Sequence, residues 1–478
     1  MGVVAGLLIF KGLNRMAKVL EKHKKYRDKY GSNEIYWGLG IEEETYFQFT
    51  KPVHVATPII RSCHKAERYS VNYYTTYKPG HMKALEHLFP DASGCVPLPF
   101  FVNAHCFTKM DISGNHTTTY EKIPCPNPKF YGKTFLDELQ AFSPMFKDDY
   151  EVHYTFDGDS IEFMTLGFYK TKAADVIEEL VNYKKKFLGE VNRFLDEKGR
   201  HREKGLLEYP PRNPGFAVFY SNPANIVMFN NGTYHINLTL PSILGPASAE
   251  GEPAPLAFPD LFKMQHRQCI RMIQWLEPLL LAVYGTADPL SGYSRRYTKA
   301  SQRCCVARYI GIGTYDTETM TEGKLLTLDV KKVKGSSLPY WWYTKYHKTS
   351  GYNPLEQIGM DINYRKHYNH GIEMRFFDWF AEDRLGDLLS FLVHACEAAL
   401  ERPESDQAVM SQTWNQFVID ILKDGAATFI TEEVAGMYEK LLGIQLVGKK
   451  LTANDAFAYI FKELKRIYKK GECVKRML

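Results

Sequence analysis

The stretch WGLGIEEETYFQF, residues 37–49, carries the pattern that predicts the fold. Side chains alternate between the two faces of a β-strand, so its odd-numbered positions form an apolar face with Glu43 as the one charged member. The even-numbered positions form the opposite face: Gly38, Gly40, Glu42 and Glu44. Glycines weaken a strand interior unless something must approach closely. The pattern therefore predicts a half-buried strand with two carboxylates beside open space, and the alternative is a solvated acidic edge strand.

Three more stretches combine an apolar face with a polar face: DGDSIEFMT at 157–165, NGTYHINLTLP at 231–241 and HGIEMRFFDW at 370–379. By the same alternation, their polar faces carry Glu162 in the first, His235, Asn237 and Thr239 in the second, and Glu373 and Arg375 in the third. Each alone has an ordinary explanation: a solvent-facing glutamate, a structural histidine, or a surface ion pair that contributes little. The Met, Phe and Trp residues around the third pair favour instead a strand that lines a cavity.

If the four strands share one sheet, their polar faces bring together four glutamates, one histidine and one arginine: Glu42, Glu44, Glu162, Glu373, His235 and Arg375. Ionised carboxylates this close need a counter-charge. Mg²⁺ or Mn²⁺ suits a carboxylate-rich set with one imidazole, whereas zinc favours fewer ligands and more nitrogen or sulfur. Such ions most often serve phosphate chemistry, in which an arginine stabilises the transferred group.

The composition limits the class of protein. The chain has 478 residues, 45% of them apolar, which is enough to bury a large core. A net charge of +5 argues against a nucleic-acid partner held by phosphate contacts. The nine cysteines are scattered, so we expect free thiols in a reducing compartment and a cytoplasmic protein. We also expect no signal peptide and no transmembrane segment.

Helices are predicted where apolar residues recur at helical spacing: 173–195, 260–284, 385–400, 412–423, 432–442 and 453–467. The stretch from Pro241 to Pro259 contains five prolines and is predicted to be an extended loop. Because the strand-like stretches lie among these helices rather than in one block, we predict an α+β fold with a helical C-terminal portion.

Both ends of the chain are basic. Residues 11–29 carry eight Lys and Arg against two acids, and residues 462–476 carry seven against two. Apolar residues at helical spacing accompany both, so we interpret them as solvated helix faces rather than membrane or nucleic-acid patches. We therefore divide the chain into a basic N-terminal helix over 1–30, a main domain over 31–400 and a helical extension over 401–478.

In chain order, GIEEET, DGDSIEFMT, GTYHINLTLP and INYRKHYNHGIEMRFFDW resemble the motifs of the glutamine synthetase/glutamate–cysteine ligase superfamily. The likeness is greatest to the amidoligase branch of carboxylate–amine ligases and spans about residues 36–400. It implies a curved antiparallel sheet whose concave face binds ATP and Mg²⁺. It also implies a reaction in which a carboxylate is phosphorylated to an acyl phosphate, which an amine then attacks to give an amide.

The resemblance also implies roles for individual residues. Glu42, His235 and Glu373 would hold a metal ion on the terminal phosphates of ATP. Glu44 and Glu162 would hold a metal ion nearer the acyl group. The remaining assignments are Arg375 for the transferred phosphoryl group, Arg308 or Arg303 for substrate or phosphate, and Asn237 for the nucleotide side of the polar face. The proline-rich loop would be a lid that excludes water.

The sequence departs from the superfamily pattern at two flanks. Thr165-Leu-Gly167 stands where Ser-Pro is usual, and His370-Gly-Ile-Glu-Met-Arg375 stands where HGTEFR is usual. Neither change removes a proposed metal or phosphate ligand. Both flanks shape the acceptor pocket, so the donor acid and the acceptor amine stay open.

Two other functions fit the same residues. One is a ligase fold without activity that serves as a structural or interaction protein through its basic ends. The other is a phosphotransferase that uses the same metal ions to phosphorylate a guanidino acceptor. The sequence contains no GxxxxGKS/T, HExxH or GxSxG motif and no complete GxGxxG motif, so the usual nucleotide-loop, zinc-protease and hydrolase alternatives are not indicated.

Overall fold

The computed structural model describes residues 37–51, 53–56, 95–98, 101–108, 131–157, 160–165, 172–200, 202–211, 233–241, 258–287, 299–301, 362–363, 371–406, 408 and 411–468. The predicted N-terminal helix over 1–30, most of the proline-rich loop, Arg303 and Arg308 lie outside the described residues.

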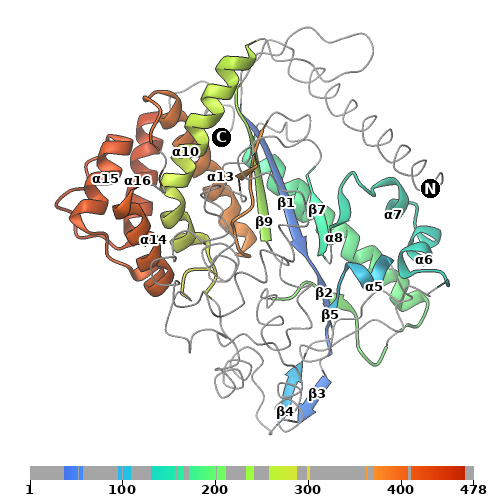
Figure 1. Cartoon of the computed structure of the whole chain (residues 1–478). Helices are drawn as coiled ribbons and strands as arrows, with labels where there is room; N and C mark the ends of the chain where they lie inside the picture. The colour runs from blue at the N-terminus through green and yellow to red at the C-terminus, as the bar shows by residue number, and fades with distance from the viewer. Residues whose placement is uncertain are drawn as a thin grey trace.

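An antiparallel sheet of six strands, in the order β10-β11-β9-β1-β7-β6, runs through the middle of the described part (Figure 1). Its strands are β1 (Gly38–Thr45), β6 (Tyr154–Asp157), β7 (Ser160–Met164), β9 (Thr233–Thr239), β10 (Ile362–Asn363) and β11 (Gly371–Met374). The four strands predicted from the sequence are the neighbours β11, β9, β1 and β7. The prediction of an α+β fold is confirmed, and the four strands share one sheet.

The strand predicted over 37–49 is divided at Tyr46. β1 ends at Thr45, where its pairing with β7 also ends, so the backbone beyond it needs other partners. β2 (Phe47–Phe49) finds them in a second sheet, between β5 (Phe101–Val102) and β8 (Leu207–Glu208). A separate two-stranded sheet pairs β3 (Val53–Ala56) with β4 (Cys95–Leu98).

The strand predicted within 370–379 is shorter than expected, because β11 ends at Met374. The residues that follow turn toward the end of a long helix instead of extending the sheet. The carboxylate of Asp378 accepts a hydrogen bond from the backbone N–H of Thr286 at 3.1 Å. The ring of Phe380 lies 5.1 Å from that of Tyr284. These contacts outside the sheet end the strand.

The described helices are α5 (Ala104–Thr108), α6 (Phe135–Phe142), α7 (Met145–Asp148), α8 (Ala173–Glu197), α10 (Pro259–Tyr284), α13 (Leu385–Leu400), α14 (Gln412–Asp424), α15 (Glu432–Leu442) and α16 (Ala453–Tyr468), with 3₁₀ turns η7 (Glu382–Arg384) and η9 (Gly425–Ala427). All six predicted helices are confirmed. Their ends agree with the structure to within two residues. Among the helices described, none combines the length and the apolar character needed to cross a membrane.

Helix α8 covers the apolar face of the sheet. The ring of Phe187 on α8 is fully buried and meets that of Phe163 on β7 edge to face at 5.2 Å. Aromatic rings of this size bury much apolar area, so this layer supplies a large part of the core. The covered face is therefore unavailable to ligands, which leaves the opposite face of the sheet for a site.

The C-terminal helices pack together beside the sheet (Figure 1). α10 contacts α13, α14 and α16, while α15 contacts α14. The Trp275 carbonyl of α10 accepts hydrogen bonds from the indole N–H of Trp414 at 3.2 Å and from the hydroxyl of Tyr438 at 3.0 Å. The helical C-terminal portion is thus confirmed, and it shares its core with α10. The free cysteines of the described part, Cys106, Cys269 and Cys396, are buried.

Candidate functional site

The register of the sheet places the acidic residues on one face. Residues directly opposite each other in an antiparallel pair point to the same side. Glu42 on β1 lies opposite His235 on β9. The other opposed pairs on this face are Glu44 with Glu162, and Glu373 with Asn237. This face is turned away from the apolar residues beneath α8.

Glu42, His235 and Glu373 form the first cluster. Nδ1 of His235 lies 3.5 Å from Oε2 of Glu42 and 3.5 Å from Oε1 of Glu373. All three residues are buried, and one ligand atom from each lies within 4.8 Å of the others. These are the residues that the sequence analysis assigned to one metal ion.

Glu44, Glu162 and Asp157 form the second cluster, also with ligand atoms within 4.8 Å of one another. Glu44 and Glu162 are buried, while Asp157 is exposed. Oε2 of Glu44 lies 3.7 Å from Nε2 of His235. The imidazole therefore stands between the two clusters, with one nitrogen toward each.

Asp157 is a candidate site residue that the sequence analysis missed. It ends β6, opposite Ser160 of β7, so it shares a face with Glu162. The sequence analysis treated the residues before Ser160 as a turn only. The alternation of Tyr154 and Phe156 with Thr155 and Asp157 was the signal for a strand that pairs with β7 as a hairpin.

The donor chemistry of both clusters fits a hard divalent cation. His235 carries at most one positive charge, while carboxylates of Glu42, Glu44 and Glu373 all lie within 4.0 Å of its nitrogens. Opposite ligands of Mg²⁺ are about 4.2 Å apart, twice the ~2.1 Å bond length. Within each cluster the ligand atoms lie no more than 4.8 Å from one another, which is compatible with one ion held between them. Carboxylate oxygens with a single imidazole suit Mg²⁺ or Mn²⁺ better than zinc.

Asn237 supplies a further observation on the same face. Its side chain is buried, and within the described residues its amide nitrogen Nδ2 has no hydrogen-bond partner. A buried donor without a partner is destabilising, and a bound ligand would remove that cost. Gly40, directly opposite on β1, adds no side chain to this part of the face. The pair thus offers a buried donor opposite a residue without a side chain.

The structure describes one of the three arginines predicted for the site. Arg375 directly follows β11 and is half-buried, two residues after Glu373. Arg303 and Arg308 lie outside the described residues, as does most of the predicted lid. Their roles stay predictions.

The back of β1 is held by a buried ion pair. Glu43 points to the covered face, where its Oε2 lies 2.7 Å from Nζ of Lys184 on α8. Lys184 also pairs with Glu382 of η7. Burial raises the pKa of Glu43, and Lys184 opposes that rise. Burial lowers the pKa of Lys184, but the two carboxylates outweigh it and raise the pKa overall, which keeps the ammonium charged.

Comparison with known proteins gives a family. The chain is 36% identical over 460 residues to "Uncharacterized protein R704" of Acanthamoeba polyphaga mimivirus. The aligned region covers 95% of this chain and 79% of the viral protein. The chain belongs to the same family as this viral protein. No family model matches the sequence. No solved structure matches it.

Proposed function

We propose that this protein is an ATP-dependent carboxylate–amine ligase of the glutamine synthetase/glutamate–cysteine ligase superfamily. The observation that carries the proposal is the pair of acidic clusters on one sheet face, joined by His235. Two divalent ions side by side on a protein surface typically serve phosphoryl transfer. In this proposal the acidic face is the concave side of a curved sheet.

Each of the two clusters would hold one metal ion. Glu42, His235 and Glu373 would hold Mg²⁺ or Mn²⁺ at the terminal phosphates of ATP. Glu44, Glu162 and Asp157 would hold a second ion nearer the carboxylate substrate. When bound, the ions neutralise phosphate charge. Without the ions, the closely spaced carboxylates would repel the phosphates of ATP, so the proposed activity depends on the metal.

The remaining residues of the face would position the substrates. Arg375 would stabilise the charge on the phosphoryl group in transfer. Asn237 would donate its free amide N–H to the nucleotide side. The carboxylate oxygen of one substrate attacks the terminal phosphorus and ADP leaves. The amine of the second substrate then attacks the acyl carbon, loses its proton and displaces inorganic phosphate, leaving an amide.

The test is the release of ADP and phosphate from Mg·ATP in the presence of pooled amino acids, polyamines and peptides with a γ-carboxylate. The variants Glu42→Gln and Glu373→Gln each replace one charged ligand with a neutral group of the same shape. Glu197→Gln is the matched control, because Glu197 is an exposed helix residue paired with Arg193 at 3.0 Å. We expect release that depends on the pool, is lost in both site variants and is unchanged in the control.

Other outcomes identify other functions. ADP formed without free phosphate, with phosphate recovered on a pool component, would indicate a phosphotransferase on the same site. Unchanged turnover in Glu373→Gln would contradict the assignment of the site. Neither turnover nor Mg·ATP binding by calorimetry would overturn the proposal in favour of a structural role.

A further inference from the structure

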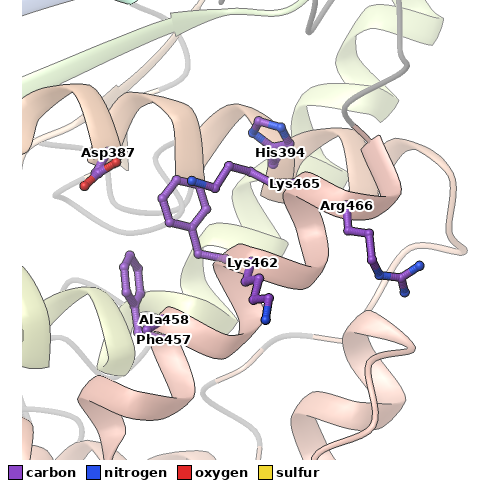
Figure 2. Close-up of a pocket in the computed structure, with 8 residues that line it drawn as sticks. Asp387, His394, Phe457, Ala458, Lys462, Lys465 and Arg466 are labelled. Atoms are coloured by element: carbon purple, nitrogen blue, oxygen red, sulfur yellow. The ribbon is translucent and has the colours of Figure 1, made fainter.

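A second candidate site lies in the helical part of the molecule. Helices α13 and α16 line an open pocket of about 630 Å³ (Figure 2). Its lining is Asp387 and His394 from α13, and Phe457, Ala458, Phe461, Lys462, Lys465 and Arg466 from α16. The volume is within the range of roughly 300–1,000 Å³ typical of small-molecule sites. None of the residues of the acidic sheet face takes part.

The lining follows from two helical rows on α16. Phe457, Phe461 and Lys465 are spaced four residues apart and lie one above another. Ala458, Lys462 and Arg466 form the adjacent row. These basic residues open the C-terminal basic stretch at 462–476. Lys462 and Arg466 are exposed, as a solvated face predicts, but the helix also gathers them beside two aromatic rings.

The pocket has an apolar floor. Phe457 and Phe461 are largely buried, and the ring of Phe391 lies 4.4 Å from Phe457 and 5.6 Å from Phe461. The Phe461 ring also lies 3.9 Å below Nζ of Lys465. A cation held over an aromatic ring can pair with an anionic group next to a flat apolar surface.

His394 is the observation that points to a ligand. Its side chain is fully buried, and its Nδ1 lies 2.6 Å from the Ser390 carbonyl oxygen, so this nitrogen carries the proton and donates. Among the described residues, Nε2 of His394 is buried and has no hydrogen-bond partner. A polar atom left in this state in a native fold needs an explanation. A hydroxyl-bearing ligand in the pocket would donate to it.

The charges are arranged along the pocket. Asp387 lies at one end, and His394, Lys465 and Arg466 lie toward the other (Figure 2). The three basic side chains of the lining, Lys462, Lys465 and Arg466, outnumber its one carboxylate, so the pocket favours an anionic group. Asp387 would repel a second anionic group at its end, which disfavours polyphosphates and polyanions. Arg466 also binds Glu463 at 2.9 Å, so the two lysines carry most of the free positive charge.

We propose that the α13–α16 pocket binds a small phosphate monoester with a flat apolar body. The phosphate would lie among Lys462, Lys465 and Arg466, with a protonated oxygen donating to Nε2 of His394. The apolar body would lie on Phe457 and Phe461, and a hydroxyl or amine at its far end would meet Asp387. The site is independent of the proposed ligase activity.

The experiment is calorimetric titration of the full chain in EDTA, so that the acidic face binds no metal. Phenyl phosphate tests the head and the body together, inorganic phosphate tests the head alone, and benzyl alcohol tests the body alone. The double variant Lys462→Met/Lys465→Met removes two charges and keeps the apolar stems. Lys440→Met, on the exposed side of α15, is the matched control.

We expect phenyl phosphate to bind one site per chain, and more tightly than either fragment. The double variant should weaken it by about tenfold or more, equivalent to about 1.4 kcal/mol, and the control should not. Removing a buried polar group can unfold the chain. The binding of phenyl phosphate by His394→Gln is therefore compared with that of the wild type only after the circular dichroism spectra of the two proteins match. Equal affinity in the double variant, equal binding of benzyl alcohol, or no binding at millimolar concentration would overturn the proposal. Loss of binding in Glu373→Gln would also overturn it, because the ligand would then occupy the acidic face.

Discussion

Glu43 of β1 and Lys184 of α8 form a buried ion pair, 2.7 Å from Oε2 to Nζ, directly behind the acidic face of the sheet. The neighbours Glu42 and Glu44 point the other way, because side chains alternate along a strand. One strand therefore uses three consecutive glutamates for two purposes. Two offer ligand atoms, and the third attaches the strand to the helix that covers it.

The first prediction concerns this ion pair. Lys184→Met should lower the free energy of unfolding by about 3–5 kcal/mol, because it leaves the Glu43 carboxylate buried without its cation. Urea unfolding followed by circular dichroism measures the loss. Lys186→Met is the control, since Lys186 is 57% exposed and its pairing with Asp149 is a surface contact. The double variant Glu43→Gln/Lys184→Met should recover most of the stability, and an equal loss in both single lysine variants would contradict the prediction.

The second prediction concerns the first cluster. Glu373→Gln should weaken Mn²⁺ binding by at least about tenfold, since losing a direct ligand costs no less than losing its supporting partner. The same variant should not lower the melting temperature in EDTA, because it removes one of several neighbouring negative charges. Electron paramagnetic resonance of free Mn²⁺ and thermal unfolding measure the two quantities. A variant that loses stability but keeps its metal affinity would show that Glu373 is structural.

The third prediction concerns Asp157, the candidate ligand that the sequence analysis missed. Asp157→Asn should reduce the number of Mn²⁺ ions bound per chain from two to one at a metal concentration that just fills both sites of the wild type. Asp148→Asn, an exposed carboxylate on α7, should leave the number unchanged. A titration that still reaches two ions in Asp157→Asn would remove Asp157 from the second cluster.

The fourth prediction is a pH dependence of stability at His394. Burial, aided by the charge of Lys465, lowers the pKa of His394, although the hydrogen bond to Ser390 opposes the shift. The folded protein thus keeps the ring neutral where the unfolded chain takes up a proton. The contribution of the neutral His394 ring to the free energy of unfolding is full above about pH 6.5 and is lost as the pH falls toward the folded pKa. The loss is at most about 1.4 kcal/mol per pH unit.

Urea unfolding at several pH values between 5 and 8, for the wild type and His394→Gln, isolates this effect from the other histidines. The wild type should lose more stability than the variant as the pH falls. Parallel curves for the two proteins would contradict the prediction.

Local pattern accounts for the elements that the sequence analysis predicted well. The six helices were predicted because apolar residues recur within each segment, and a helix satisfies its own backbone hydrogen bonds. The strand ends were predicted less well. The segment beyond Thr45 left the main sheet because β7 no longer paired with it there. β11 ended at Met374 because the residues after it contact the end of α10 through Asp378 and Phe380.

The sequence by itself determined which side chains share a face of each strand, since alternation along a strand depends on nothing beyond that strand. It also determined the donor chemistry, because oxygen and imidazole ligands are properties of the residues. Only the tertiary structure decided that His235 stands between Glu42 and Glu44, that Asp157 joins Glu162, and that Lys184 lies behind them. These relationships depend on strand register and helix packing between segments far apart in the chain, and no local pattern specifies them.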